Sequence, residues 1–172
     1  MPCSGALSRP GAKIGIFISG EALAMSSEPW ATILLAEDEP GILYTFKEIL
    51  EEAGFRVRAA QTFEAAKKWI ERDQCDVVIT DFSLEKEDLG LELAREAKKR
   101  TPAPAVLIYS DYPTIERLRA AHALPIDYFA FKPVDPEEIK TAISRLAARR
   151  AESLAWSWSQ GLKRRREPMG CR

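Results

Sequence analysis

Hydrophobic residues gather in five short runs between residues 33 and 131, and longer amphipathic segments separate the runs. Four runs are continuously apolar, as expected of parallel strands that are covered on both faces. The second run alternates, with Arg56 and Arg58 on one side, which is typical of an edge strand with one face in water. The five predicted strands lie at 33–36, 55–59, 77–79, 105–109 and 128–131.

The segments that follow the strands carry apolar residues at the period of an α-helix. The first predicted helix has Pro40 in its first turn and Gly54 just after its end, where each residue type is favoured. Thr62 is the expected N-cap of the second helix. The fifth begins with Asp135 and Pro136, an N-cap followed by a first-turn proline. The apolar stripes are Ile42, Phe46, Ile49, Leu50 and Ala53; Ala66, Trp69 and Ile70; Leu89, Leu93, Ala94 and Ala97; Ile115 and Leu118; and Ile139, Ala142, Ile143, Leu146 and Ala147.

Strand and helix therefore alternate five times between about residues 31 and 150. This alternation predicts an α/β fold, in which right-handed crossovers build a parallel sheet with helices on both faces. The 172 residues fit one domain with tails and leave little room for a second.

The amino-acid composition of the chain argues against several classes of function. Acidic and basic residues nearly cancel at a net charge of −1, so the chain as a whole does not resemble a nucleic-acid binder. Three widely separated cysteines form neither a metal motif nor a disulfide framework, which favours a reducing, cytoplasmic compartment. A single histidine, His122, argues against a histidine-rich metal site and a Ser-His-Asp triad. No apolar stretch approaches the about 20 residues that span a bilayer.

The two ends of the chain differ from its centre. Residues 1–29 are predicted to be a flexible N-terminal extension; Gly15 and Gly20 interrupt its short apolar run, which disfavours a secretory signal, and Met25 is an alternative start. Residues 149–172 hold seven basic side chains against two acidic ones. We expect 151–172 to be a basic tail, helical through Leu154 and disordered after it. Trp156 and the tail's basic residues could bind nucleic acid or anionic lipid, but the tail is too short for a helix-turn-helix domain.

Polar residues follow four of the predicted strands. In a doubly wound sheet such residues share one rim, at the carboxyl ends of the strands. Crowded carboxylates repel one another unless a cation is present, and Mg²⁺ suits an open site of oxygen ligands. An aspartate can accept a phosphoryl group, while lysine and a hydroxyl stabilise its charge. The residues at this rim are Glu37, Asp38 and Glu39 after the first strand, Asp81 after the third, Ser110 after the fourth and Lys132 after the fifth.

This constellation resembles the receiver domain of response regulators, the CheY-like modules of two-component phosphorelays, over residues 30–150. The matching motifs are the acidic pair Glu37-Asp38, Asp81 at the end of Val78-Ile79-Thr80-Asp81, Ser110, and Lys132-Pro133. Asp38, Asp81, Ser110 and Lys132 are separated by 43, 29 and 22 residues, spacings similar to the family's. The resemblance implies a flavodoxin-like doubly wound sheet of strand order 2-1-3-4-5.

The resemblance also implies a role for each acidic residue. Asp81 would be the phospho-acceptor. Asp38, Asp81 and the backbone carbonyl of Ser83 would hold Mg²⁺, with Glu37 helping directly or through a water molecule.

Further implied roles concern signalling. Ser110 and Lys132 would contact the phosphoryl group, and Ser110 with Phe129 would form the conformational switch. The Lys132–Pro133 bond would be cis. The donor would be a histidine kinase or a histidine phosphotransfer protein, and the downstream protein partner would bind the face made by the fourth and fifth helices. Apart from phosphorylation and dephosphorylation of its own aspartate, the chain would not be an enzyme.

The sequence departs from the family pattern near Asp81. Glu37 stands where aspartate is commoner, and Glu85 stands in place of a usual proline. Gly90 comes about one residue late, after a charged insert at 85–88, and Asp111 stands where a small residue is usual.

These departures keep alternatives open. A receiver-like module that binds proteins without phosphorylation is the main one. An aspartate-nucleophile phosphatase is disfavoured because Ser83 stands where a second, acid-base aspartate would be needed. A dinucleotide enzyme is disfavoured because acidic residues, not a glycine-rich turn, follow the first strand.

Overall fold

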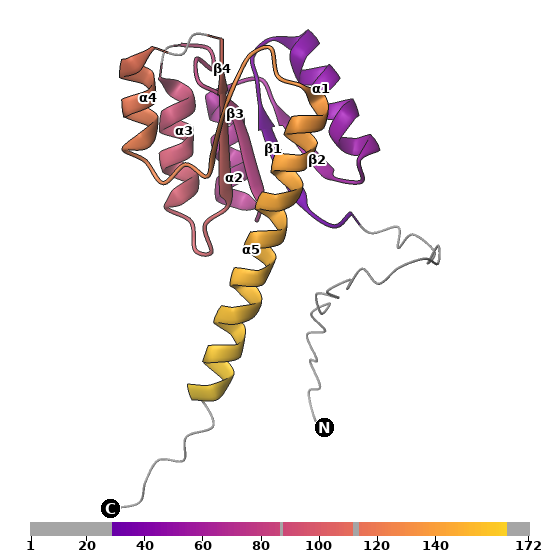
Figure 1. Ribbon diagram of the computed structural model, residues 1–172, viewed down its shortest axis with the longest axis vertical. Helices are drawn as coiled ribbons and strands as arrows, with labels where there is room; N and C mark the ends of the chain where they lie inside the picture. The colour runs from indigo at the N-terminus through magenta and orange to yellow at the C-terminus, as the bar shows by residue number, and fades with distance from the viewer. Residues whose placement is uncertain (1–28, 87, 112–113, 165–172) are drawn as a thin grey trace, which may run out of the picture.

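The computed structural model describes residues 29–164 apart from 87 and 112–113, and for residues 120 and 159–164 only the backbone. Five strands and five helices alternate along this part of the chain, as the hydrophobic pattern predicts (Figure 1). They are β1 Thr32–Ala36, α1 Pro40–Glu52, β2 Arg56–Ala60, α2 Phe63–Arg72, β3 Val77–Asp81, α3 Leu89–Lys98, β4 Ala105–Ser110, α4 Ile115–His122, β5 Tyr128–Phe131 and α5 Pro136–Arg164.

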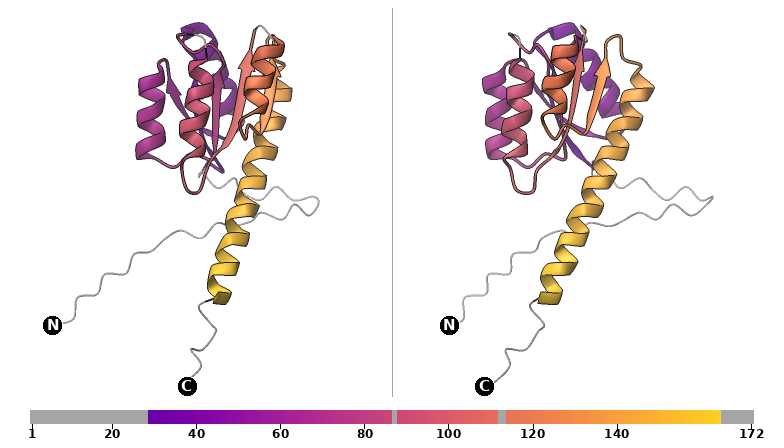
Figure 2. Two further views of the ribbon diagram at one scale, coloured as in Figure 1. Left: turned by 90° about the vertical axis from the view of Figure 1, so that its left-hand side faces the viewer. Right: turned by 60° about the vertical axis from the view of Figure 1, so that its left-hand side comes forward.

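The strands form one parallel sheet in the order β2-β1-β3-β4-β5. This confirms the predicted flavodoxin-like α/β architecture, including the position of β2 at an edge. Helices α1 and α5 cover one face of the sheet, and α2, α3 and α4 cover the other (Figure 2). Because β1 lies between β2 and β3, the chain reverses its direction of winding after β2, and a crevice opens at the carboxyl ends of β1 and β3.

Two apolar layers hold the helices to the sheet, and alternate residues of each central strand supply one layer each. Ile33 and Leu35 of β1 point to the α1/α5 side, whereas Leu34 points to the α2/α3/α4 side. The strand residues that fill these layers are almost completely buried, so the backbone of the three central strands is fixed from both faces. That rigidity positions the residues at the ends of the strands.

Local backbone features mark the predicted ends of helices α1 and α2 and the Lys132–Pro133 bond. The hydroxyl of Thr62 accepts a hydrogen bond from the backbone N–H of Ala65 at 3.2 Å and caps α2. Gly54 follows α1 with φ of +88°, the left-handed conformation that glycine tolerates best. The Lys132–Pro133 bond is cis, as the family resemblance implies.

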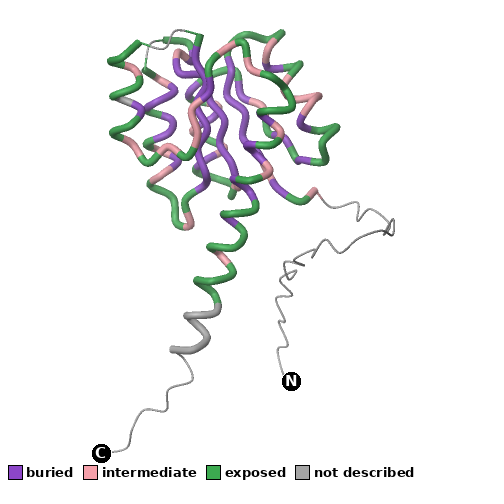
Figure 3. The backbone as a smooth tube through the Cα atoms, viewed as in Figure 1, coloured by how far each residue is buried: buried purple, intermediate pink, exposed green. Residues whose placement is uncertain are grey.

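Helix α5 extends beyond the domain. It packs on the sheet as far as Arg150, whose guanidinium contacts Asp76 at 3.3 Å and the carbonyl group of Ala103. From there the helix runs away from the sheet with its residues mostly exposed (Figure 3). It ends at Arg164, beyond Leu154, where the apolar pattern predicted its end. The predicted N-terminal extension and the last residues of the basic tail lie outside the described part of the chain.

No helix in the described segments is both long and apolar enough to cross a bilayer. The 29-residue α5 has the length, but charged residues recur along it.

The β3–α3 loop accommodates the charged insert by reaching across to α2. Glu85 adopts a left-handed conformation with φ of 57°, and its carboxylate accepts a hydrogen bond from the backbone N–H of Phe63 at 2.6 Å. An anionic group at this position also interacts favourably with the helix dipole. Leu84 is completely buried, so the loop is anchored to the core on one side and to α2 on the other.

Gly90 allows α3 to approach the end of β3. A Cβ atom at this position would lie 1.9 Å from the backbone carbonyl oxygen of Asp81. The Gly90 N–H donates a hydrogen bond to the Phe82 carbonyl at 3.1 Å, which holds the same two segments together. Gly90, which comes about one residue later than in the family pattern, therefore stands where only a residue without a side chain fits, directly beneath the rim of polar residues.

The variant Gly90→Ala should lower the free energy of unfolding by about 3 kcal/mol, because the added methyl group forces the backbone of α3 away from β3. Urea denaturation at 25 °C measures the change. Gly41→Ala is the matched control, since no atom lies within 4 Å of a Cβ at that helical position and the free energy should not fall. Equal effects of the two variants would contradict the steric explanation.

Candidate functional site

Three carboxylates converge at the carboxyl ends of β1 and β3. Glu37 and Asp38 follow β1, and Asp81 is the last residue of β3. One oxygen atom from each lies within 4.8 Å of the others. Glu37 and Asp81 are buried, at 1% and 7% exposed, whereas Asp38 is exposed. The structure thus brings together three acidic residues that the sequence placed at separate strand ends.

Glu37 is held through both oxygens of its carboxylate. Its Oε1 accepts a hydrogen bond from the backbone N–H of Glu39 at 3.2 Å, and its Oε2 accepts one from the hydroxyl of Tyr109 at 2.6 Å. Burial raises the pKa of Glu37 above its ordinary value, although the hydrogen bond from Tyr109 and the charge of Lys132 work in the opposite direction.

Lys132 supplies the positive charge. Its ammonium group lies 3.2 Å from Oδ2 of Asp81, 3.4 Å from Oε2 of Glu37 and 3.5 Å from Oδ2 of Asp111. It also lies 4.9 Å from the centre of the Tyr109 ring. Burial works to lower the pKa of Lys132, but attraction to Asp81 and Glu37 outweighs it and raises the pKa. One cation is therefore shared by three acids.

The remaining predicted site residues surround this cluster. Ser110 is buried at the end of β4, and its carbonyl accepts a hydrogen bond from the N–H of Lys132 at 2.9 Å. The N–H of Ser83 donates a hydrogen bond to Oδ1 of Asp81 at 3.3 Å, so Ser83 adjoins Asp81. Phe129 is half-buried and packs against Phe82 and Phe131. The roles assigned to Ser110, Phe129 and the Ser83 carbonyl stay predictions.

Tyr109 is a site residue that the strand pattern did not identify. It is 1% exposed and belongs to an apolar strand, so its hydrophobic ring accounts for its position without any function. Its only distinguishing signal was a hydroxyl group one residue before Ser110. Burial and the negative charge of Glu37 raise the pKa of Tyr109 well above its ordinary value, which keeps the hydroxyl protonated as a hydrogen-bond donor.

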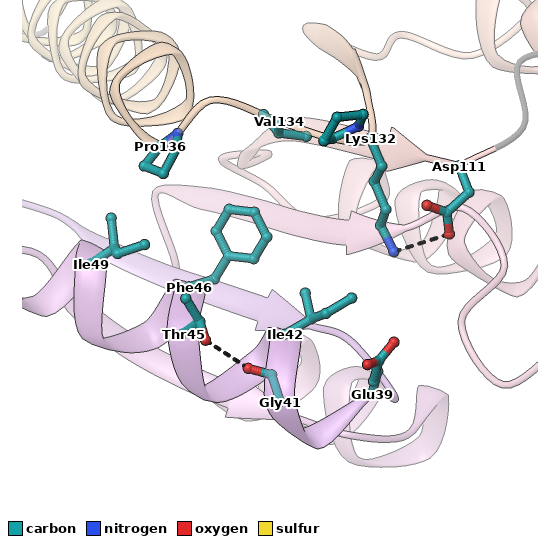
Figure 4. A pocket seen from close by; sticks show the side chains of 11 residues that line it. Glu39, Gly41, Ile42, Thr45, Phe46, Ile49, Asp111, Lys132, Val134 and Pro136 are labelled. Carbon is teal, nitrogen blue, oxygen red and sulfur yellow. Dashed lines mark hydrogen bonds and ion pairs between the residues drawn. The ribbon is translucent and has the colours of Figure 1, made fainter.

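An apolar groove adjoins the cluster between α1 and the segment that joins β5 to α5. It has a volume of about 740 Å³, and Ile42, Phe46 and Val134 contribute to its walls (Figure 4). Lys132 and Asp111 lie at one end, with their side chains directed toward each other. The groove therefore connects an apolar surface to the polar rim.

The donor set fits a small, hard divalent cation. The cluster offers carboxylate oxygens and no histidine or thiolate, and its three negative charges exceed the single charge of Lys132. Mg²⁺ prefers such ligands and is commonly bound by one or two carboxylates with several waters. Glu37, Asp38 and Asp81 could hold such an ion.

The sequence matches the family model of the response regulator receiver domain over residues 33–144. The chain belongs to the response regulator receiver family. Receiver domains are signalling modules of two-component systems. Their fold and acidic site are the ones described above, which confirms the family resemblance drawn from the strand-end residues.

The curated relatives are longer proteins, and this chain matches only a part of each. It is 30% identical over 121 residues to the alginate biosynthesis transcriptional regulatory protein AlgB of Pseudomonas aeruginosa, covering 70% of this chain and 26% of that protein. It is 28% identical over 138 residues to the transcriptional regulatory protein GlrR of Escherichia coli, covering 80% of this chain and 31% of that protein. The chain thus spans less than a third of the length of either relative.

A solved receiver domain provides a structural match. The response regulator receiver domain protein from Clostridium thermocellum is 31% identical and superposes with a TM-score of 0.64, covering 70% of this chain and 97% of that one. The superposition takes in nearly the whole of that receiver domain, so its fold and that of this chain agree.

The raised pKa of Glu37 predicts how the free energy of unfolding depends on pH. A group whose pKa is raised by folding stabilises the protein most below its ordinary pKa of 4.5, and this contribution is lost as the pH rises through the folded value. Glutamine does not titrate. The free energy of unfolding of Glu37→Gln, relative to the unsubstituted protein, should therefore increase between about pH 4 and pH 7.

Urea denaturation in the presence of EDTA measures this difference at each pH. Glu52→Gln removes an exposed glutamate from α1 and is the control, with an expected difference that stays flat. A flat profile for Glu37→Gln as well would show that burial does not penalise its charge.

Proposed function

We propose that this receiver domain accepts a phosphoryl group on Asp81 from a phosphohistidine of a histidine kinase or phosphotransfer protein, and that it signals through a conformational change. The observation that carries the proposal is the meeting of Glu37, Asp38, Asp81 and Lys132 at one rim of the sheet. Phosphoryl transfer requires mainly positioning and charge stabilisation, which these four residues can supply.

In the proposed reaction a carboxylate oxygen of Asp81 attacks phosphorus, the bond between phosphorus and the donor's imidazole nitrogen breaks, and the imidazole leaves with the electron pair. The N–H of Ser83 and the ammonium of Lys132 already bind the two oxygens of Asp81 and so orient it. Mg²⁺, when bound, neutralises charge on the transferred group. Lys132 and the hydroxyl of Ser110 would hold the phosphoryl oxygens of the product.

The apolar groove supports the approach of a protein donor. A phosphohistidine must come within bonding distance of Asp81, so the donor's surface has to lie on the rim around it. The groove between α1 and the β5–α5 segment opens on that rim and offers Ile42, Phe46 and Val134 for apolar contact. The burial of apolar surface there would add affinity without involving the reacting groups.

Signalling would involve the α4–β5–α5 side of the domain. Ile115, Leu118 and Phe131 are apolar yet 64%, 38% and 47% exposed, which suits a surface for a downstream protein. Phe129 packs between Phe82, next to the acceptor, and Phe131 on this surface, so it is the proposed switch. A cytoplasmic location remains our expectation, and the longer relatives are named as transcriptional regulatory proteins.

One observation favours the alternative, a receiver-like module that binds partners without phosphorylation. Asp111 makes an ion pair with Lys132 at 3.5 Å and presents a third carboxylate to the ammonium. The Asp111 carboxylate already interacts with the Lys132 ammonium, which a phosphoryl group on Asp81 would also need as its counter-charge. The two functions therefore differ in whether Asp81 can be modified at all.

Incubation of the full chain with Mg²⁺ and acetyl phosphate should increase its intact mass by one phosphate group. Asp81→Asn should abolish the increase, because an amide is not a nucleophile for this transfer. Asp73→Asn, at an exposed position after α2, is the control and should be modified like the unsubstituted protein. An unmodified Asp81 would favour the phosphorylation-independent module.

Asp111→Ala should accelerate this phosphorylation. The carboxylate of Asp111 repels an anionic donor and competes for Lys132, and because its side chain is 56% exposed its effect is about 1 kcal/mol, or about fivefold in rate. The time course of the mass increase gives the rate. High salt should reduce the difference between the two proteins. A salt-independent acceleration would point to a steric effect instead.

A further inference from the structure

Tyr109 combines complete burial with a direct contact to the acidic cluster. Its side chain enters the apolar layer between the sheet and helices α1 and α5, and is 1% exposed. A buried hydroxyl without a partner would cost stability, and this one donates to Oε2 of Glu37 at 2.6 Å. The contact joins residues that are 72 positions apart in the sequence.

The Tyr109 ring is fixed by its neighbours. Phe46 of α1 lies 5.6 Å from it between ring centres, and the ammonium of Lys132 lies 4.9 Å from its centre. The backbone of residue 109 is paired with Asp81 across β3 and β4. The position of the hydroxyl is therefore set by the core of the domain.

Glu37 needs such a fixed donor more than an aspartate would. Its side chain has one more rotatable bond, so ordering its carboxylate costs more conformational entropy. The Glu39 N–H holds only Oε1. Lys132, the other group near Oε2, divides its charge among Glu37, Asp81 and Asp111, whereas the Tyr109 hydroxyl is directed at Glu37.

We propose that Tyr109 is a positioning residue that orients the Glu37 carboxylate for a divalent cation and so sets the preference of the site for Mg²⁺ over Ca²⁺. The proposal rests on the metal site of the proposed function. Mg²⁺ demands near-ideal octahedral geometry at about 2.0–2.1 Å, whereas Ca²⁺ accepts irregular geometry at about 2.3–2.6 Å. A loosely held Glu37 would therefore impair Mg²⁺ binding more than Ca²⁺ binding.

The test compares metal affinities of the full chain by isothermal titration calorimetry, with Mg²⁺ and Ca²⁺ titrated separately. Tyr109→Phe removes only the hydroxyl and should raise the Mg²⁺ dissociation constant by about tenfold, the lower end of the usual effect of removing a partner of a metal ligand. The Ca²⁺ constant should rise less, so the ratio of the two affinities falls. Tyr44→Phe, at a 65% exposed position on α1, is the control and should change neither.

A double-mutant cycle separates positioning from a general loss of stability. In a Glu37→Asp background the shorter carboxylate no longer reaches the hydroxyl, so Tyr109→Phe should change the Mg²⁺ constant by less than about twofold. Thermal unfolding in EDTA verifies that each variant is folded at the temperature of the titration.

The outcomes discriminate between the two proposals. Failure of the unsubstituted chain to bind Mg²⁺ would overturn the metal site and this inference together. Normal Mg²⁺ binding by Tyr109→Phe would overturn this inference alone. So would an equal loss for both ions, or an equal effect of Tyr109→Phe in both backgrounds, because either would indicate a merely structural role.

Discussion

The excess of negative charge around Lys132 is the constraint on which the site depends. Asp81, Glu37 and Asp111 all lie within 3.5 Å of one ammonium group, and two of these three acids are buried. Like charges in a poorly solvated place repel, so such a cluster needs the rigid sheet in addition to its own hydrogen bonds and its attraction to Lys132. The apolar layers on both faces of β1, β3 and β4 supply that rigidity. Binding of a cation would relieve the repulsion, whereas a phosphoryl group would add negative charge and compete for Lys132.

The sheet topology explains why residues so distant in the sequence meet. Because β1 lies between β2 and β3, the loops after β1 and β3 leave in opposite directions and expose the strand ends between them. Gly90 then permits α3 to pass close beneath Asp81, and Glu85 ties the intervening loop to α2. The insert that departs from the family pattern is therefore part of the scaffold of the site.

Most of the fold could be predicted from the sequence because its signals are local. Continuous apolar runs marked the strands, and Pro40, Gly54 and Thr62 marked helix ends with mechanisms that act within one turn. The convergence of Asp38, Asp81 and Lys132 followed from parallel strands alone. Tyr109 was not identified because its hydrophobic ring satisfies the strand pattern, and its contact with Glu37 exists only in three dimensions. The hydrogen bond between the Phe63 N–H and Glu85 was not predictable for a similar reason, since it joins a left-handed loop residue to another helix. The extent of α5 was underestimated because the basic composition of the tail was interpreted as a sign of disorder after Leu154.

The outer part of α5 has a mechanical consequence. The helix is fastened to the domain at Arg150 and continues to Arg164, a length of about 20 Å at the ordinary helical rise. Its other end begins at Pro136, which lines the same groove as Lys132. A tilt of about 10° where the helix leaves the sheet would displace its tip by about 3–4 Å, the scale of a side-chain contact. The length of this outer segment would therefore amplify, at its tip, any change in the direction in which the helix leaves the sheet.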